Sequence, residues 1–241
     1  MKTTKKPFAH YLFKNWLWLA VNASLLAFAA YLAWRVVNAP FSSGWVSFSG
    51  QKSLSDIVLF SGKLALILLL LSLACTPLAR ILGWQAAITV RKSLGLWAFG
   101  LACFHSLFFL QGKALFTRQD VGFTIWQVVN DTINIVRYGS KVPHAEAGVY
   151  ALALLLPLAL TSNRLAMRYL GKNWKRLHRL VYLAVPVAVW HYWWRQASFL
   201  NTEPPDYRQP AIFAVLVTLL LILRIAPVRR WLAERLKLQT K

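Results

Sequence analysis

The sequence predicts an all-α integral membrane protein, a bundle of six transmembrane helices with both termini in the cytoplasm. Three observations predict this fold class. The chain is 58% hydrophobic with a mean hydropathy of +0.47, which is more apolar than a soluble domain needs to fill its core. Its apolar residues form runs close to the roughly 20 residues that cross the hydrocarbon of a bilayer. Its 28 Lys and Arg residues, against 7 Asp and Glu, fall mainly between those runs.

Six apolar runs are candidates for membrane spans. Their approximate limits are 15–37, 55–79, 93–112, 146–162, 176–196 and 210–227. The run from Trp16 continues at spanning length without a small-residue cleavage site, so we interpret it as the first anchor and not as a signal peptide. The chain then divides into a cytoplasmic segment 1–14, a transmembrane domain 15–227 and a basic cytoplasmic tail 228–241.

The charges predict the orientation of the bundle. With the N-terminus in the cytoplasm, most of the cations lie on the inner side, and every acid except Glu234 lies on the outer side. This bias explains the net charge of +21, which would otherwise suggest binding to phosphate backbones. We therefore expect contact with membrane lipid and no nucleic-acid partner. The two cysteines, Cys75 and Cys103, lie inside apolar runs and form neither a disulfide framework nor a CxxC metal site.

The longest connection, about residues 113–145, lies on the outer side in this topology. Loops of such length without structure of their own are uncommon. Its apolar residues recur at steps of three and four, which predicts an amphipathic helix on the membrane surface. These residues are Phe123, Trp126, Val129, Ile133 and Val136. The segment is either a docking platform for an outer partner or a surface-anchored loop.

Two of the five histidines lie inside predicted spans, where an ionisable side chain is costly and indicates function. His105 follows Arg91, at the inner end of the third span, by 14 residues, and His191 follows Arg176, at the inner end of the fifth, by 15. At 1.5 Å per residue both lie roughly 20 Å from the inner face. Such a pair could ligate one heme iron from opposite sides, bind another metal, or be structural. His10 and His144 lie in polar segments and are assigned no role.

A heme between these histidines needs a flat apolar slot, and a heme held by two neutral imidazoles has no open iron position and suits electron transfer. Aromatic residues near both histidines could build the slot. They are Phe104, Phe108, Trp190, Trp193 and Trp194.

His178 precedes His191 by 13 residues and so lies roughly 20 Å closer to the inner face. On an ideal helix the two side chains point about 140° apart, although Pro186 between them can alter the helix. Cations surround this depth and could hold a flavin phosphate or a heme propionate, or simply obey the positive-inside bias. Those proposed to bind the anionic group are Arg91, Lys92, Lys172, Lys175 and Arg179.

Three segments resemble the MsrQ (YedZ) branch of the ferric-reductase-like transmembrane family: LACTPLAR, RKSLGLWAFGLACFHSLFFL and LTSNRLAMRYLGKNWKRLHRLVYLAVPVAVWHYWW. The resemblance covers about residues 53–230. Its most specific parts are W-x-x-L-H-R-L-x-Y-L and the following W-H-Y-x-W.

The resemblance implies a six-helix bundle in the bacterial inner membrane that carries heme b, one or two copies, and FMN. The family's heme-associated histidines correspond to His105, His178 and His191. It further implies an electron-transfer subunit fed by the quinone pool or a cytosolic flavin reductase, which delivers electrons to MsrP, a periplasmic molybdopterin enzyme that reduces methionine sulfoxide in oxidised proteins. The chain carries no molybdopterin machinery, so it is not itself the methionine sulfoxide reductase.

Two features depart from the wider family. Arg91 stands where many members have an inner histidine on the third span, which argues against a complete second bis-histidine heme. The outer loop is longer than the family pattern. Two alternatives remain open: a free-standing transmembrane ferric or quinone reductase, and a heme-free membrane scaffold.

Overall fold

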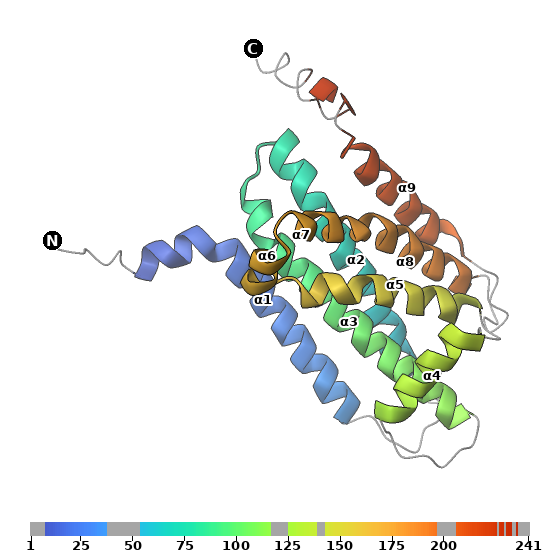
Figure 1. Ribbon diagram of the computed structural model, residues 1–241. Helices are drawn as coiled ribbons and strands as arrows, with labels where there is room; N and C mark the ends of the chain where they lie inside the picture. The colour runs from blue at the N-terminus through green and yellow to red at the C-terminus, as the bar shows by residue number, and fades with distance from the viewer. Residues whose placement is uncertain are drawn as a thin grey trace.

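The computed structural model describes residues 8–37, 54–116, 125–138, 143–196, 206–225, 227, 228, 230–232 and 235. All regular elements within these residues are helices (Figure 1). The α-helices are α1 Phe8–Val37, α2 Leu54–Ile81, α3 Ala86–Phe116, α4 Ile125–Tyr138, α5 Pro143–Leu160, α6 Arg164–Leu170, α7 Lys172–Leu177, α8 Val181–Gln196 and α9 Arg208–Ile222, with a 3-10 turn η1 at His178–Leu180. The all-α prediction is confirmed for this part of the chain.

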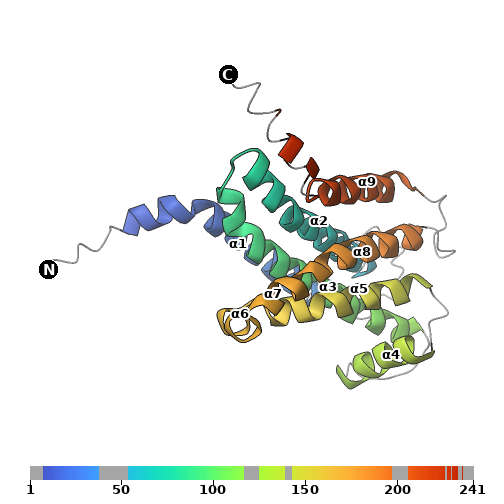
Figure 2. The same cartoon turned by 45° about the horizontal axis from the view of Figure 1, so that its top comes forward.

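The helices form a bundle around two antiparallel pairs, α2 with α3 and α5 with α8. The tight connection between α2 and α3 uses Gly83, whose φ of 71° favours a residue without a Cβ. Helix α1 lies along α3, and α9 lies against α8 and α2, while α4 packs against α5 and α3 (Figures 1 and 2). The four central helices are thus each packed against at least two neighbours.

The buried core follows the central helices. Leu69 and Leu73 of α2, Ala98 of α3 and Val185 of α8 are each less than 9% exposed. Many large apolar side chains elsewhere are exposed, as expected for a surface that meets lipid and not water. In the α1 window that could cross a membrane, only 6% of the residues are buried, against 50% in α2, so α1 is peripheral and α2 central.

Three of the described helices are long and apolar enough to cross a membrane, namely α1, α2 and α3. Helices α5 and α6 meet this criterion only together, but a bend of 93° separates them. Helix α9 is apolar but has only 15 residues. Helices therefore stand at all six predicted positions, while length and composition support three or four spans.

The ends of two predicted spans differ from the structure for local reasons. Helix α5 ends at Leu160, and Asn163 then caps α6 by accepting a hydrogen bond from the Ala166 amide at 2.8 Å, which starts the new helix direction. At the opposite end of these helices, α3 continues to Phe116, and α5 begins with Pro143, a residue favoured in the first turn of a helix.

The predicted helix of the outer connection exists as α4. Its Val129, Ile133 and Val136 are 40%, 49% and 55% exposed, whereas Ile135 is buried. Phe123 lies outside the described residues. The side chain of Trp126 is also outside the description. Among the described side chains of α4, Ile135 packs onto the bundle and Val129, Ile133 and Val136 remain on the surface.

Candidate functional site

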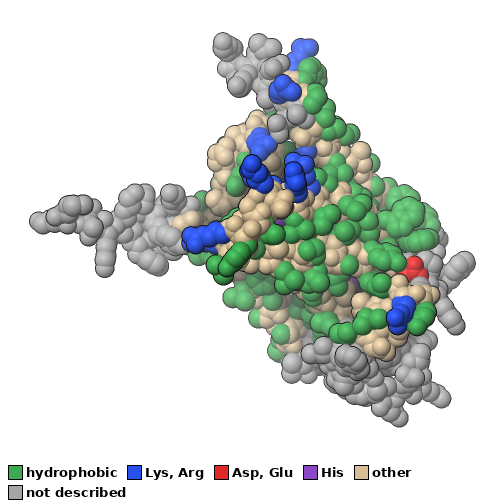
Figure 3. All heavy atoms as spheres, viewed as in Figure 1, with side chains coloured by type: hydrophobic (Ala, Val, Ile, Leu, Met, Phe, Trp, Pro, Cys, Tyr) green, Lys and Arg blue, Asp and Glu red, His purple; other side chains and the backbone are tan. Residues whose placement is uncertain are grey.

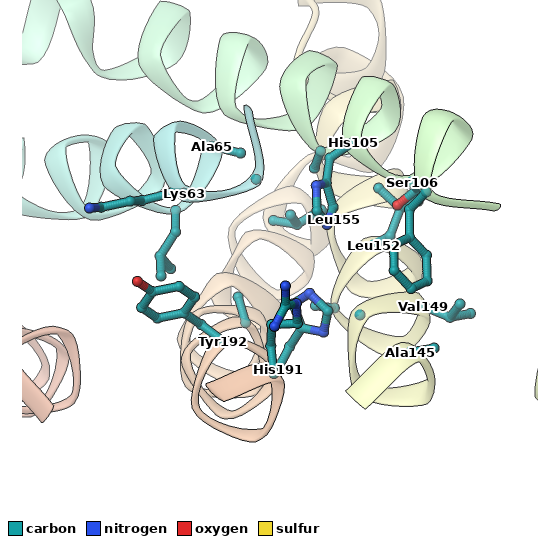
Figure 4. Close-up of a pocket in the computed structure, with 18 of the residues that line it drawn as sticks. Lys63, Ala65, His105, Ser106, Ala145, Val149, Leu152, Leu155, His191 and Tyr192 are labelled. Atoms are coloured by element: carbon teal, nitrogen blue, oxygen red, sulfur yellow. The ribbon is translucent and has the colours of Figure 1, made fainter. Parts of the chain in front are cut away.

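A cavity of about 120 Å³ lies between α2, α3, α5 and α8, and Ile135 of α4 also lines it (Figure 4). Many of its lining residues are very small, so their backbones can approach a flat group closely. The small residues are Gly62, Ala65, Ala98, Ala102, Ala145, Gly148, Ala151 and Ala188. Two histidines, one from α3 and one from α8, project into this space (Figure 4).

His105 and His191 face each other across the cavity. Their ring centres are 6.1 Å apart and their planes are inclined by 74°. The matched depth predicted from the sequence thus corresponds to a real proximity. Since a metal bonds an imidazole nitrogen at about 2 Å, two rings on opposite sides of one ion have their centres roughly 6 Å apart. The pair therefore has the separation that a single shared metal ion requires.

The orientation of His105 is set by its surroundings. Its Nδ1 lies 2.7 Å from the carbonyl oxygen of Val58, so the ring donates its Nδ1 proton there and leaves Nε2 facing the cavity. Its ring also stacks on Phe109, with centres 6.2 Å apart. A backbone acceptor for the far ring nitrogen is the usual support of a metal-bound histidine.

Two glycines make room for the two imidazoles. A Cβ on Gly62 would lie 2.7 Å from Nδ1 of His105, and a Cβ on Gly148 would lie 3.0 Å from Nδ1 and Cε1 of His191. The first distance is shorter than side chains tolerate, and the second is tight. Each histidine therefore sits over a glycine of a neighbouring helix, His105 over α2 and His191 over α5.

The aromatic residues expected to build a slot do not line the cavity. The rings of Phe104 and Phe108 lie against each other at a tilt of 38°, with centres 4.5 Å apart, and Trp190, Trp193 and Trp194 are 56%, 36% and 41% exposed. The prediction was wrong because none of the five stands four residues from its histidine; at 100° per residue they point about 60° to 160° away from it. Phe109, four residues after His105, does line the cavity.

His178 occupies a different place. It stands in the 3-10 turn before α8, does not line the cavity, and stacks on Trp174 with ring centres 4.0 Å apart. Its Nδ1 donates to the Trp174 carbonyl at 3.1 Å, and its Nε2 lies 3.5 Å from Oγ of Ser162. The indole of Trp174 donates to the Thr161 carbonyl at 2.9 Å. The ring of His178 is thus held by the Trp174 carbonyl on its Nδ1 side, and it also interacts with the Leu158 backbone.

Arg91 belongs to this second region. Its charge acts on His178, Arg224 and Tyr182. Arg224, which the sequence analysis did not single out, reaches from beyond α9 to the Tyr182 hydroxyl at 2.7 Å and the Leu73 carbonyl at 2.6 Å. Arg91 is half-buried, whereas the other cations predicted to bind an anionic group are exposed. It is therefore the best placed of them to bind a group inside the protein.

The other cations predicted to bind an anionic group lie at the surface. Figure 3 shows Lys and Arg side chains gathered where α6 and α7 lie. The exposed members of the predicted set are Lys92, Lys172, Lys175 and Arg179. They form a basic surface rather than an enclosed pocket.

Sequence reasoning missed the two cations that line the cavity, Lys63 of α2 and Arg195 of α8. A signal existed for both. Lys63 interrupts the apolar run of the second span, and Arg195 follows His191 by four residues, the spacing that places two side chains on one helix face.

Taken together, the fold and the cavity define a class of protein: a helical membrane protein whose central helices hold two facing imidazoles around an apolar space suited to a flat group with a metal at its centre. Among the described residues no cluster of three or more His, Cys, Asp or Glu could hold a bare metal ion. Two protein ligands and small flat walls fit a porphyrin iron, whose macrocycle supplies the other ligands.

The comparisons with known proteins agree with this class. The family model described as ferric reductase like transmembrane component matches residues 61–189. Similar curated proteins, each named protein-methionine-sulfoxide reductase heme-binding subunit MsrQ, occur in Herminiimonas arsenicoxydans (36% identity over 73% of this chain and 72% of the relative), Xanthomonas axonopodis pv. citri (36%, 85% and 84%) and Bordetella pertussis (32%, 85% and 85%). The chain belongs to the ferric-reductase-like transmembrane family and, within it, to the MsrQ proteins.

Proposed function

We propose that this chain is a heme b-binding subunit that carries electrons across the bacterial inner membrane to MsrP, the periplasmic molybdopterin methionine sulfoxide reductase. The observation that supports the heme site is the separation of 6.1 Å between the rings of His105 and His191 inside an apolar cavity. The name of the relatives, heme-binding subunits of a methionine sulfoxide reductase, supports the same function.

His105 and His191 are the proposed iron ligands. The Val58 carbonyl holds the His105 ring with Nε2 toward the cavity, and Gly62 and Gly148 leave both rings the space they occupy. Most of the residues around the pair are apolar. Held by these two histidines, a heme would supply a one-electron carrier for the transfer.

The region around His178 and Arg91 is the proposed site of a second cofactor, either FMN or a second heme. Arg91 would hold an anionic group there, and the exposed Lys92, Lys172, Lys175 and Arg179 would attract it. Electrons would enter at this end from quinol or a cytosolic flavin reductase and pass to the His105 and His191 pair.

This function requires both termini in the cytoplasm and six spans. In such a topology α7, η1 and α8 form one span, α5 another and α9 the last, and α4 lies on the periplasmic face. There it would rest on the lipid surface beside the cavity, close to the docked reductase.

The test is a reduced-minus-oxidised absorption spectrum, with heme counted per chain by pyridine hemochrome, on purified full-length protein. We expect low-spin b-type bands that disappear in His105→Ala and in His191→Ala. Arg137→Ala, an exposed change on α4 away from the lining of the cavity, is the control, and it should keep wild-type bands. A wild-type protein without heme, or ligand variants with unchanged bands, would refute the proposal. In His178→Ala, a fall in heme count of about one per chain would mean a second heme at that region, and an unchanged count would favour FMN there.

A further inference from the structure

The cavity has two chemically different ends. The lining residues nearer the α2–α3 connection are Leu66, Leu69, Ala98, Leu155 and Ala188, which are apolar. Arg195, Ser106 and Tyr192 line it toward the opposite end of the same helices, beside apolar residues such as Leu59 and Phe109. Because α2 and α5 run antiparallel to α3 and α8, these assignments agree along all four helices. A bound planar group therefore meets one wholly apolar end and one end that also carries polar side chains and a cation.

Arg195 lines the cavity together with both histidines. It lies one helical turn beyond His191 on the same face of α8, about 6 Å further along the axis. Its charge also acts on His105, on the other side of the cavity. Lys63 lines the same cavity, but Figure 4 shows its ammonium group directed away from the two imidazoles. Arg195 is thus the better placed of the two to meet the bound group.

Among the described residues that line the cavity, Lys63 and Arg195 are the cations. A guanidinium is the side chain best suited to a carboxylate, which it binds with two parallel hydrogen bonds. Heme b carries two carboxylates, both on one edge of an otherwise apolar ring. The two ends of the cavity match the two edges of that ring.

We propose that Arg195 binds a propionate carboxylate of the heme held between His105 and His191, and so fixes which edge of the ring faces the polar end of the cavity. This inference rests on the proposed heme-binding function. It adds a positioning residue to the site and sets the orientation of the group within it. The apolar edge then packs against the Leu69 and Leu155 end.

The test compares two probes, hemin and hemin dimethyl ester, whose propionates are blocked. Full-length protein stripped of heme in detergent is titrated with each probe, and the bis-imidazole absorption bands are followed. We expect the wild type to bind hemin at least about tenfold more tightly than the ester, because only hemin offers a charged carboxylate. Arg195→Gln should remove this preference and Arg195→Lys should restore part of it. Arg137→Gln, an exposed change of equal charge on α4, should keep it.

The outcomes separate two failures. If the wild type forms no bis-imidazole bands with either probe, the proposed heme site is wrong. If it forms them with both probes at equal affinity, or if Arg195→Gln keeps the preference, only the role of Arg195 is wrong. A preference lost in Lys63→Gln but kept in Arg195→Gln would overturn the assignment in favour of Lys63. The comparison of probes on the wild type needs no variant to fold.

Discussion

The close approach of His105 to Gly62 allows a specific prediction, because Gly62→Ala adds a single methyl group that points at one imidazole ring. The new Cβ would stand 2.7 Å from Nδ1 and 2.8 Å from Cε1 of the ring. Ordinary contact begins at 3.4 Å, so the ring must retreat by about 0.7 Å. That movement stretches or breaks the bond of 2.7 Å to the Val58 carbonyl.

The cost follows from two terms. Leaving the buried Nδ1 donor of His105 unpaired costs about 1–3 kcal/mol, while the Val58 carbonyl keeps its bond from the Ser61 hydroxyl. Overpacking a close contact costs about 1–3 kcal/mol as well. The lower ends of the two ranges add to about 2 kcal/mol. Borne by the heme-bound state, this cost corresponds to a loss of heme affinity of roughly 30-fold. Helix propensity acts in the opposite direction, since Ala stabilises a helix interior by about 0.5–1 kcal/mol relative to Gly.

Two other glycines provide a graded control. Gly148→Ala would place its Cβ 3.0 Å from the His191 ring, so we expect a smaller loss of heme. Gly100→Ala, on the same helix as His105, would meet nothing within 4 Å and should keep full heme content with equal or better stability. The predicted order of heme content is therefore Gly100→Ala, then Gly148→Ala, then Gly62→Ala.

The assay is heme per chain after identical expression and purification, together with the positions of the reduced bands and the thermal midpoint in detergent. A Gly62→Ala protein with wild-type heme content and unchanged bands would refute the packing argument. Equal losses in all three variants would instead indicate a general effect of removing glycine from these helices.

Three further changes test other contacts. Ile135→Ala removes the side chain by which α4 covers the cavity, so water should enter and the heme midpoint potential should fall, which a redox titration measures against wild type. Asn22→Leu removes the acceptor of the Trp97 indole bond at 3.1 Å that ties α1 to α3; we expect a loss of about 1–2 kcal/mol in unfolding free energy with unchanged heme bands, and altered bands would show that α1 shapes the site. Trp174→Leu removes the ring stacked on His178 and should change only signals that the His178→Ala variant also changes, so a loss of the cavity heme would contradict the separation of the two regions.

The histidine pair could be predicted from the sequence because depth along a helix depends on one constant, the rise per residue. Counting from Arg91 to His105 and from Arg176 to His191 used only that constant, and the two rings do lie 6.1 Å apart. The all-α fold was predictable for a similar reason, since backbone groups in hydrocarbon must be satisfied within the segment.

The walls of the cavity could not be predicted in the same way, because they depend on the rotation of each helix about its axis. Phe108 and Phe109 are neighbours in sequence, yet only Phe109 lines the cavity. Gly62 and Gly148 are important only through the rings that pack on them, and those rings belong to other helices. A single sequence does not show which residues of different helices contact each other. Depth along a helix, by contrast, can be calculated from that helix alone.

The relation between His178 and His191 shows how far the ideal helix can mislead. Thirteen residues of α-helix would point them about 140° apart, but the three residues of η1 turn by about 120° each instead of about 100°, which changes the angle by roughly 60°. In the structure both rings lie against the same segment, His191 over Gly148 of α5 and His178 beside Ser162, just after α5 ends. Gly148 and Ser162 are 14 residues apart, and the two histidines that contact them are 13 residues apart. Nearly equal spacings are expected for two antiparallel helices that lie side by side. Helix α5 with its terminal turn is therefore the element shared by both histidine regions, and its residues decide how closely each imidazole can approach.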